Sequence, residues 1–372
     1  MKNKLLITSA LAGSLIAGSA LAQTTITGSL DLTYNAHSKD LSAGVGSSRG
    51  LGRESQINVQ NKGKLNVLGL DYAAGFALEF DGTGTSNGTV STTPDHSVTN
   101  ENVYIDLISG NTTFTIGVDH IQRGYAGATP QIVSIIDQMA GAGSQTTFVI
   151  GARTSEAAGV GIMQNVPGTG IRASYFYAPR SMDTGTGDMN ALVANTGTNS
   201  SYEFGINGTD AFGMKGLTLM AFKNKMEKSA LSRLGDVEGT TYGIGYNFGQ
   251  FAIGVDRLID KNNNIANAQA VDQALAESDT RTKEADTKRV GVTFAVNKDL
   301  TIGLVQTKTD FSGSATASQN QTETVKALQV GYSLGPVALS LTHAKYSELA
   351  SRNGTAAGDD GTFSVARLST RF

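Results

Sequence analysis

Apolar and polar residues alternate with a period of two along almost the whole chain. In the stretch YGIGYNF (242–248) every second residue is aromatic or branched, and the residues between them are glycine or asparagine. The stretches VGVTFAV (290–296) and LQVGYSL (328–334) repeat this pattern. Successive side chains of a β-strand point to opposite faces, so each stretch predicts a strand with one apolar face and one polar or small face. The chain as a whole therefore predicts an all-β fold.

The connections between the predicted strands alternate between short and long. The short ones fall at 109–111, 247–250, 297–299 and 334–336, and the long ones at 35–52, 82–99, 120–146, 181–200, 260–284 and 311–321. A soluble β-sandwich needs no such rhythm, whereas a membrane barrel has short periplasmic turns at one rim and long extracellular loops at the other. Counting strands by this rhythm gives sixteen over the mature chain. Each has room for the ~9–11 residues that cross a bilayer at a tilt.

The predicted fold class is thus a closed transmembrane antiparallel β-barrel of sixteen strands. Closure follows because an open sheet edge in lipid would leave backbone N–H and C=O groups without partners. A barrel of this size encloses an aqueous lumen. The second, sixth and eighth strands alternate least clearly, and the register of 153–164 stays open.

Composition narrows the functional classes. The chain has 45 glycines but only 5 prolines, which suits many strands joined by tight turns. It has no cysteine, which excludes disulfides and thiolate metal sites. The histidines (His37, His96, His120 and His343) have no metal-ligand spacing, and the net charge of −3 offers no basic surface for nucleic acid. We therefore expect no cofactor, no metal and no nucleic-acid partner.

Residues 1–22 have the features of a cleaved signal peptide. Lys2 and Lys4 form a positive start, an apolar stretch follows at 5–17, and Ala20-Leu21-Ala22 is a small-residue cleavage site. The apolar stretch is too short and too diluted by serine and glycine for a membrane-spanning helix. The sequence predicts export, with residues 23–372 forming the barrel.

The segment from Ala366 to Phe372 resembles the closing strand of the general trimeric porins of Gram-negative outer membranes, and 101–119 resembles a hairpin of that family. The resemblance implies a homotrimeric outer-membrane channel, not an enzyme, through which small hydrophilic solutes and ions diffuse passively. It implies contact with outer-membrane lipid and lipopolysaccharide. Leu368 and Phe372 would form the assembly signal that the barrel-assembly machinery reads.

In that family the third long loop folds inward, which here is 120–146. Its segment 131–139, with Ile132, Val133, Ile135 and Ile136, is expected to form a short helix against the inner wall. The resemblance places the pore constriction at Asp119, Arg123, Asp137 and Arg153.

Alternation also assigns charges to the pore wall, because a lipid-facing Arg or Lys at the bilayer midplane costs about 2–4 kcal/mol. The predicted pore-lining residues are Asp31, Glu79, Asp106, Arg172, Arg289, Arg367 and Arg371. Outward aromatic residues of interfacial girdles are Tyr34, Tyr175, Tyr177, Tyr246, Tyr332 and Phe372.

Three alternatives stay open. A barrel enzyme needs a nucleophile beside a base, and no serine motif accompanies His343. A surface adhesin would not require the regular rhythm of short and long connections. A solute-selective channel would use inward aromatics, which we expect to be few, or a cationic cluster, to which Lys62, Lys64 and Lys326 are candidates with unassigned facing.

Overall fold

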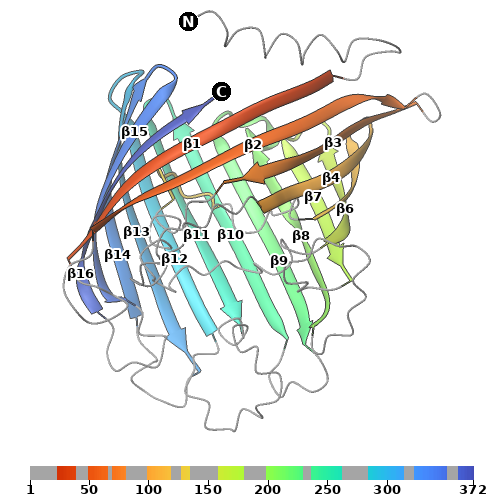
Figure 1. Cartoon of the computed structure of the whole chain (residues 1–372). Coiled ribbons are helices and arrows are strands. Elements are labelled where there is room, and N and C mark those ends of the chain that lie inside the picture. Colours follow the sequence, from red (N-terminus) through yellow and green to blue (C-terminus); the bar gives the residue numbers. More distant parts are fainter. Residues whose placement is uncertain are drawn as a thin grey trace, which may run out of the picture.

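The strands of the computed structural model run antiparallel, pair in chain order and close into one barrel where β1 meets β16 (Figure 1). The structure describes residues 23–38, 49–65, 69–80, 99–118, 127–134, 158–179, 198–228, 236–261, 284–313, 322–349 and 359–372. The predicted signal peptide lies outside these ranges. No helix within them is long and apolar enough to cross a membrane. The predicted fold class is confirmed.

The elements have the following bounds. They are β1 (Gln23–His37), β2 (Arg49–Leu65), β3 (Leu70–Glu79), β4 (Thr99–Ser109), β5 (Thr112–Val118), β6 (Ala158–Val166), β7 (Ile171–Ala178), β8 (Thr198–Thr209), the 3₁₀ turn η1 (Ala211–Gly213), β9 (Leu217–Lys228), β10 (Val237–Phe248), β11 (Phe251–Lys261), β12 (Glu284–Ala295), β13 (Leu300–Ser312), β14 (Thr322–Leu334), β15 (Val337–Leu349) and β16 (Asp359–Arg371).

Several strands run further toward the long-loop rim than the alternation predicted. β1 continues to His37 and β2 begins at Arg49, so both extend into the stretch predicted as loop. Their pairing continues to Ala36 opposite Arg49, which satisfies the backbone there. The short turns fall where they were predicted, and Gly110, Gly249 and Gly335 adopt the positive φ that such turns need.

The outer face of the barrel is apolar and exposed. It carries large side chains from all around the sheet, among them Ile26, Leu32, Ile105, Ile116, Ile162, Phe204, Ile244, Val255, Leu304, Leu328 and Leu341. An isolated exposed apolar residue is ordinary, but a continuous belt of them is the surface that a bilayer covers.

Aromatic rings gather on this face beside the short turn at 249–250. Tyr246, Phe248, Phe251 and Phe294 form a stacked row with centroid separations of 6.0, 5.7 and 4.6 Å. Of the predicted girdle residues, Tyr34, Tyr175, Tyr246, Tyr332 and Phe372 are exposed and Tyr177 is half-buried. Their place at a membrane interface stays a prediction.

The seam between β1 and β16 ends in a close contact between Gly28 and Phe372. Their backbones exchange two hydrogen bonds, with N···O distances of 2.7 and 3.0 Å. The phenyl ring of Phe372 covers Gly28 so closely that a Cβ there would lie 2.5 Å from the ring. Glycine is therefore the residue that lets this ring lie flat on the neighbouring strand.

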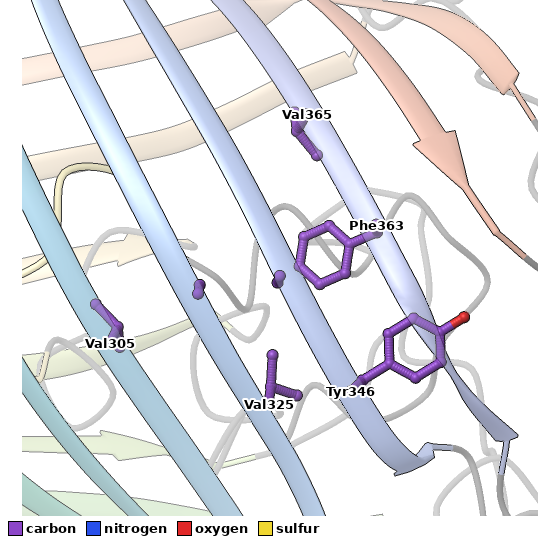
Figure 2. Packing of buried hydrophobic residues seen from close by; sticks show 7 residues of the cluster. Val305, Val325, Tyr346, Phe363 and Val365 are labelled. Carbon is purple, nitrogen blue, oxygen red and sulfur yellow. The ribbon is translucent and has the colours of Figure 1, made fainter.

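The inner face of β13 to β16 carries an apolar cluster in its long-loop half (Figure 2). Its members, each at most 4% exposed, are Val305, Val325, Ala327, Ala344, Tyr346, Phe363 and Val365. Register pairs join the four strands through Ala327, Ala344 and Phe363. Because these side chains are covered, this sector of the inner wall does not line open water.

Candidate pore site

A segment of the predicted third loop, Gly127–Ser134, lies against the inner wall across β10 to β14. Ala128 packs over Gly243 and Gly254, and Ile132 packs over Gly331. The remainder of 120–146 lies outside the described residues. The inner segment (Gly127–Ser134) therefore occupies part of the lumen and narrows it on this side.

Glycines form the surface on which the inner segment rests. A Cβ at Gly254 would lie 2.5 Å from the carbonyl oxygen of Ala128, and one at Gly291 would lie 2.4 Å from that of Pro130. Gly245, Gly254 and Gly291 are direct register partners on three neighbouring strands. Any larger residue on this glycine lane (Gly245, Gly254 and Gly291) would push the inner segment toward the middle of the pore.

A buried ion pair fixes one end of the inner segment. Arg289 Nε donates to Asp256 Oδ1 at 2.5 Å, and the two side chains are 4% and 0% exposed. The other carboxylate oxygen of Asp256 accepts the backbone N–H of Thr129 at 3.0 Å. A carboxylate can be buried at tolerable cost only when it is paired and hydrogen-bonded in this way.

Gln329 holds the other end. Its Oε1 accepts the backbone N–H of Ile132 at 2.9 Å, and its Nε2 donates to the carbonyl oxygen of Val133 at 2.7 Å. One side-chain amide thus satisfies two backbone groups of the inner segment, as an adjacent strand would.

The helix predicted over 131–139 is wrong for its first part, since 131–134 is irregular. The physical reason is that the wall takes the backbone groups a helix would need. Gln329 donates to the carbonyl oxygen of Val133, which a helix over 131–139 would need for its own hydrogen bonds. Residues 135–139 lie outside the described ranges.

A cavity of about 850 Å³ opens on the short-turn side of the inner segment. Its wall combines Pro130 and Ser134 with charged residues of β1 and β16. Arg367 Nη2 donates to Asp31 Oδ2, and Arg371 lies beside them with no ion pair to a described residue. The cavity is a polar, water-accessible space whose floor is the inner segment and whose wall carries fixed charges.

A closed barrel with an apolar outer belt and a polar, partly filled lumen is the geometry of a transmembrane pore. A family model described as Gram-negative porin matches residues 8–353. The chain belongs to the Gram-negative porin family. This porin is an outer-membrane channel for solutes, and its family and fold are those of a channel and not of an enzyme.

Solved porin structures share the fold at low sequence identity. An anion-selective porin from Comamonas acidovorans is 14% identical with a TM-score of 0.59, covering 95% of this chain and 100% of that one. Salmonella typhi OmpF in complex with daunomycin is 11% identical with a TM-score of 0.63, covering 94% and 98%. A loop-deletion mutant of OmpT from Vibrio cholerae is 12% identical with a TM-score of 0.58, covering 94% and 99%. No curated protein matches the sequence.

The predicted pore-lining residues of this porin all lie on the inner face, but only some of them are brought together. Asp31, Arg367 and Arg371 share the short-turn cavity. Asp106 accepts a hydrogen bond from Thr115 at 2.5 Å, Arg172 donates to Asn165 at 3.1 Å, and Glu79 lies opposite Gln56.

Arg289 differs from the other pore-lining candidates because it is buried beneath the inner segment, at 5% exposure. It fixes that segment and does not face open water. All four predicted constriction residues, Asp119, Arg123, Asp137 and Arg153, lie outside the described residues, so their role stays a prediction.

Sequence reasoning missed Asp256 and Gln329, which hold the inner segment. The one available signal was the run of glycines at inward positions of neighbouring strands, which marks a place where another backbone approaches. The expectation of few inward aromatics is wrong. Phe176, Phe222, Phe311, Tyr346 and Phe363 are all buried on the inner face, where they pack and do not line water.

Two residues that the sequence left unassigned lie on the outer face of the porin. Lys326 is exposed there beside Leu328, so it does not belong to a cationic cluster in the lumen. His343 shares a contact of 2.9 Å with Ser364 Oγ through Nδ1, its one side-chain hydrogen bond to a described residue. A serine hydrolase would need a further group to orient this imidazole.

Proposed function

We propose that this porin is a general diffusion pore whose narrowest section is built on the inner segment. The attachment of Gly127–Ser134 to the wall carries the proposal, since it is held at both ends and packed on the glycine lane. A segment fixed in this way sets a pore diameter instead of opening and closing with each solute. Small hydrophilic solutes and ions would pass beside it.

The proposal includes the constriction charges expected from the sequence. Asp119 and Asp137 would supply the acidic side, and Arg123 and Arg153 the basic side. Charges of opposite sign across a narrow wet section create a transverse field that orders water and sorts solutes by charge. Support for this part comes from the position of the inner segment, which begins four residues after Arg123 in the chain.

We also propose a homotrimer in the outer membrane, exported by a cleaved leader at 1–22 and assembled through the strand that contains Leu368 and Phe372. The apolar outer belt supports contact with lipid over most of the circumference. Leu368 and Phe372 are both exposed on the outer face, where an assembly factor or a neighbouring copy could reach them.

Single-channel conductance in a planar bilayer tests the pore. We expect discrete openings that close in three equal steps, one for each subunit of a trimer. Inserted protein that shows heat-dependent gel mobility but never conducts would overturn the proposal. Closure in one step would overturn the trimer and leave the pore intact.

Gln329→Ala tests the role of the inner segment. Removing the amide leaves the backbone groups of Ile132 and Val133 without their partner, so the segment should leave the wall part of the time. We expect larger current fluctuations and a changed mean conductance. Gln306→Ala, on the outer face of the neighbouring strand, is the matched control and should conduct like the wild type.

Arg371→Gln tests whether the short-turn cavity contributes to ion preference. Arg371 is the cavity's cation without a described acidic partner, so its loss should shift the reversal potential in a salt gradient toward cations. Lys298→Gln is the control at the same rim, because Lys298 is already paired with Asp299. An equal shift in both variants would contradict a specific role for Arg371.

A further inference from the structure

Lys62 and Lys64, whose facing the sequence left open, point into the lumen. Ile26 is exposed on the outer face and pairs with Val59, so the even-numbered residues of β2 face inward. Both lysines are exposed, and both lie close to Leu65, where β2 ends at the short-turn rim. They therefore place two positive charges at that end of the pore.

The other inward cations of the described wall lie at the same rim, with one exception. Arg172 lies at the start of β7 and Arg371 at the end of β16. Arg367 lies nearby on β16 and is paired with Asp31. The exception is Arg289, which is buried beneath the inner segment and is also paired. Among the described side chains, this leaves four inward cations without a paired acid, the short-turn cations Lys62, Lys64, Arg172 and Arg371.

Inward acids are distributed differently along the strands. Apart from the paired Asp31, the short-turn end of the described wall has two, Asp71 on β3 and Asp106 on β4. The short-turn cations therefore exceed them. Toward the long loops, the charged inward side chains that reach water in the described wall are acids, as at Glu54, which is exposed, and Glu79, which is half-buried. The described pore wall is thus basic at one end and acidic toward the other.

Fixed charges on the wall of a narrow, water-filled pore attract mobile ions of the opposite sign. Anions therefore gather at the short-turn end, and cations gather near Glu54 and Glu79. When the long-loop side is positive, the voltage drives both kinds of ion from these ends toward the middle of the pore, where they accumulate. When that side is negative, both kinds leave through the ends at which they are enriched. Fewer ions then remain in the pore to carry current.

We propose that this porin rectifies ionic current, conducting better when its long-loop side is positive than when that side is negative. The short-turn cations form the basic zone of the pore, and Glu54 and Glu79 belong to the acidic zone. The effect requires dilute salt, because the distance over which a charge acts falls from about 30 Å at 0.01 M to about 3 Å at 1 M. The inference rests on the proposed pore and adds a preferred direction of current to it.

Current–voltage curves of inserted channels test the proposal. The chain has no cysteine, so Asn111→Cys places a single thiol in the exposed turn between β4 and β5. A large thiol reagent that cannot cross the membrane then identifies the side that the short turns face. In dilute salt we expect the larger current when the long-loop side is positive, and the ratio of the two currents should fall to one at about 1 M salt. A ratio of one in dilute salt, or the opposite polarity, would overturn the inference.

The double variant Lys62→Gln/Lys64→Gln tests the residues. It removes half of the short-turn cations and leaves the others balanced by the two inward acids of that end. We expect the current ratio in dilute salt to fall most of the way to one. The matched control is Lys326→Gln/Lys345→Gln, which removes the same charge from the outer face and should keep the ratio of the wild type. An equal fall in the control would show that the ratio follows total charge, and the inference would be rejected.

A relocation of charge separates the position of the two lysines from their number. Adding Gln56→Lys and Asn58→Lys to the double variant moves both charges along the inner face of β2 toward the long loops. The lumen keeps its total charge, so the reversal potential in a salt gradient should stay close to that of the wild type. The current ratio should nevertheless stay near one or fall below it. A ratio restored to the wild-type value would show that position along the pore has no effect, which contradicts the proposal.

The salt dependence of the wild-type current needs no substitution, so the inference can be tested even if a variant does not insert. A wild-type channel that conducts equally in both directions in dilute salt defeats this inference and leaves the proposed pore intact. Inserted protein that never conducts defeats the proposed pore, and the inference fails with it.

Discussion

The short-turn half and the long-loop half of β13 to β15 differ in polarity on both faces. In the short-turn half the outward residues are apolar, as at Ile302, Val330 and Leu339, and the inward ones are small or polar, as at Gly303, Gln329 and Ser340. In the long-loop half the outward residues include the charged Lys308, Lys326 and Lys345. The inward ones include the apolar Val305, Val325 and Tyr346, beside the buried polar Thr309 and Glu323.

This difference locates two boundaries on one set of strands. On the outside, the change from Leu328 to Lys326 marks where lipid tails give way to headgroups and water. On the inside, the change from Gln329 to Ala327 and Val325 marks where the wall stops holding the inner segment and becomes a covered apolar cluster. The strands thus do not present one face to lipid and the other to water over their whole length.

The largest expected loss of stability distinguishes the buried inner ion pair of β11 and β12 from the outer ion pair of the same strands. Asp256→Asn leaves Arg289 buried without its counter-charge, which typically costs about 3–5 kcal/mol. Asp286→Asn breaks the pair with Arg257 on the outside of the same strands, where water screens the charges, and should cost much less. Urea unfolding of the refolded barrel measures both. Equal losses would show that the inner pair is not isolated from water.

The next largest difference in stability is expected between a lysine placed on the apolar side of the outer boundary and a lysine placed beyond it. Val330→Lys puts an ammonium in the apolar part of the outer face, at a cost of about 2–4 kcal/mol. Thr322→Lys, on the same face of the same strand but past the boundary, lies opposite Asp310 and should be nearly neutral. The measurement is the unfolding free energy in lipid vesicles. If both variants lost the same stability, the boundary would not lie between these residues.

The inner apolar cluster is tested by a smaller change. Val325→Ala removes two methyl-sized groups from a site that is 1% exposed, which should cost about 2 kcal/mol including the space left behind. Val330→Ala removes the same groups from the outer face, where lipid can fill the space, and should cost less. The cluster would not be a packed core if the two costs were reversed.

The smallest effect on stability is expected from the exposed charges on the outer face. Lys308→Gln removes one exposed partner of Asp310, which keeps Lys288. At about 0.15 M salt the urea midpoint should not change, because exposed pairs are screened. At low ionic strength a slight decrease should appear. A large loss at high salt would mean that Lys308 packs against the wall in a way that its charge does not explain.

The barrel itself could be predicted because its cause is local. Alternation in stretches such as 242–248 follows from the two faces of a single strand, and the rhythm of short and long connections follows from the two rims. Strand ends were less predictable. β11 continues to Lys261 because it pairs with Glu284 on β12, and a partner of that kind is invisible in the strand's own sequence.

The candidate site was less predictable because the residues that hold it together are far apart in the sequence. Gln329 binds Ile132 across 197 positions of the chain, and Asp256 binds Thr129 across 127. A glutamine in a strand gives no sign of such a partner. The change of polarity along these strands adds to the difficulty, since alternation shows that two faces differ but not which face contacts water. Alternation puts Lys326 on the same face as Leu328, and the closed barrel shows that this is the outer face.

Because β1 pairs with β16, the barrel can close only after the whole chain has been synthesised. β1 is made before fifteen further strands and pairs on one side with the last of them, including the Gly28–Phe372 contact. Until β16 arrives, the growing sheet has two open edges that lipid cannot satisfy and that other chains can bind. A chain that terminates early therefore cannot form a smaller channel. It leaves an open sheet that must be covered by another protein or degraded.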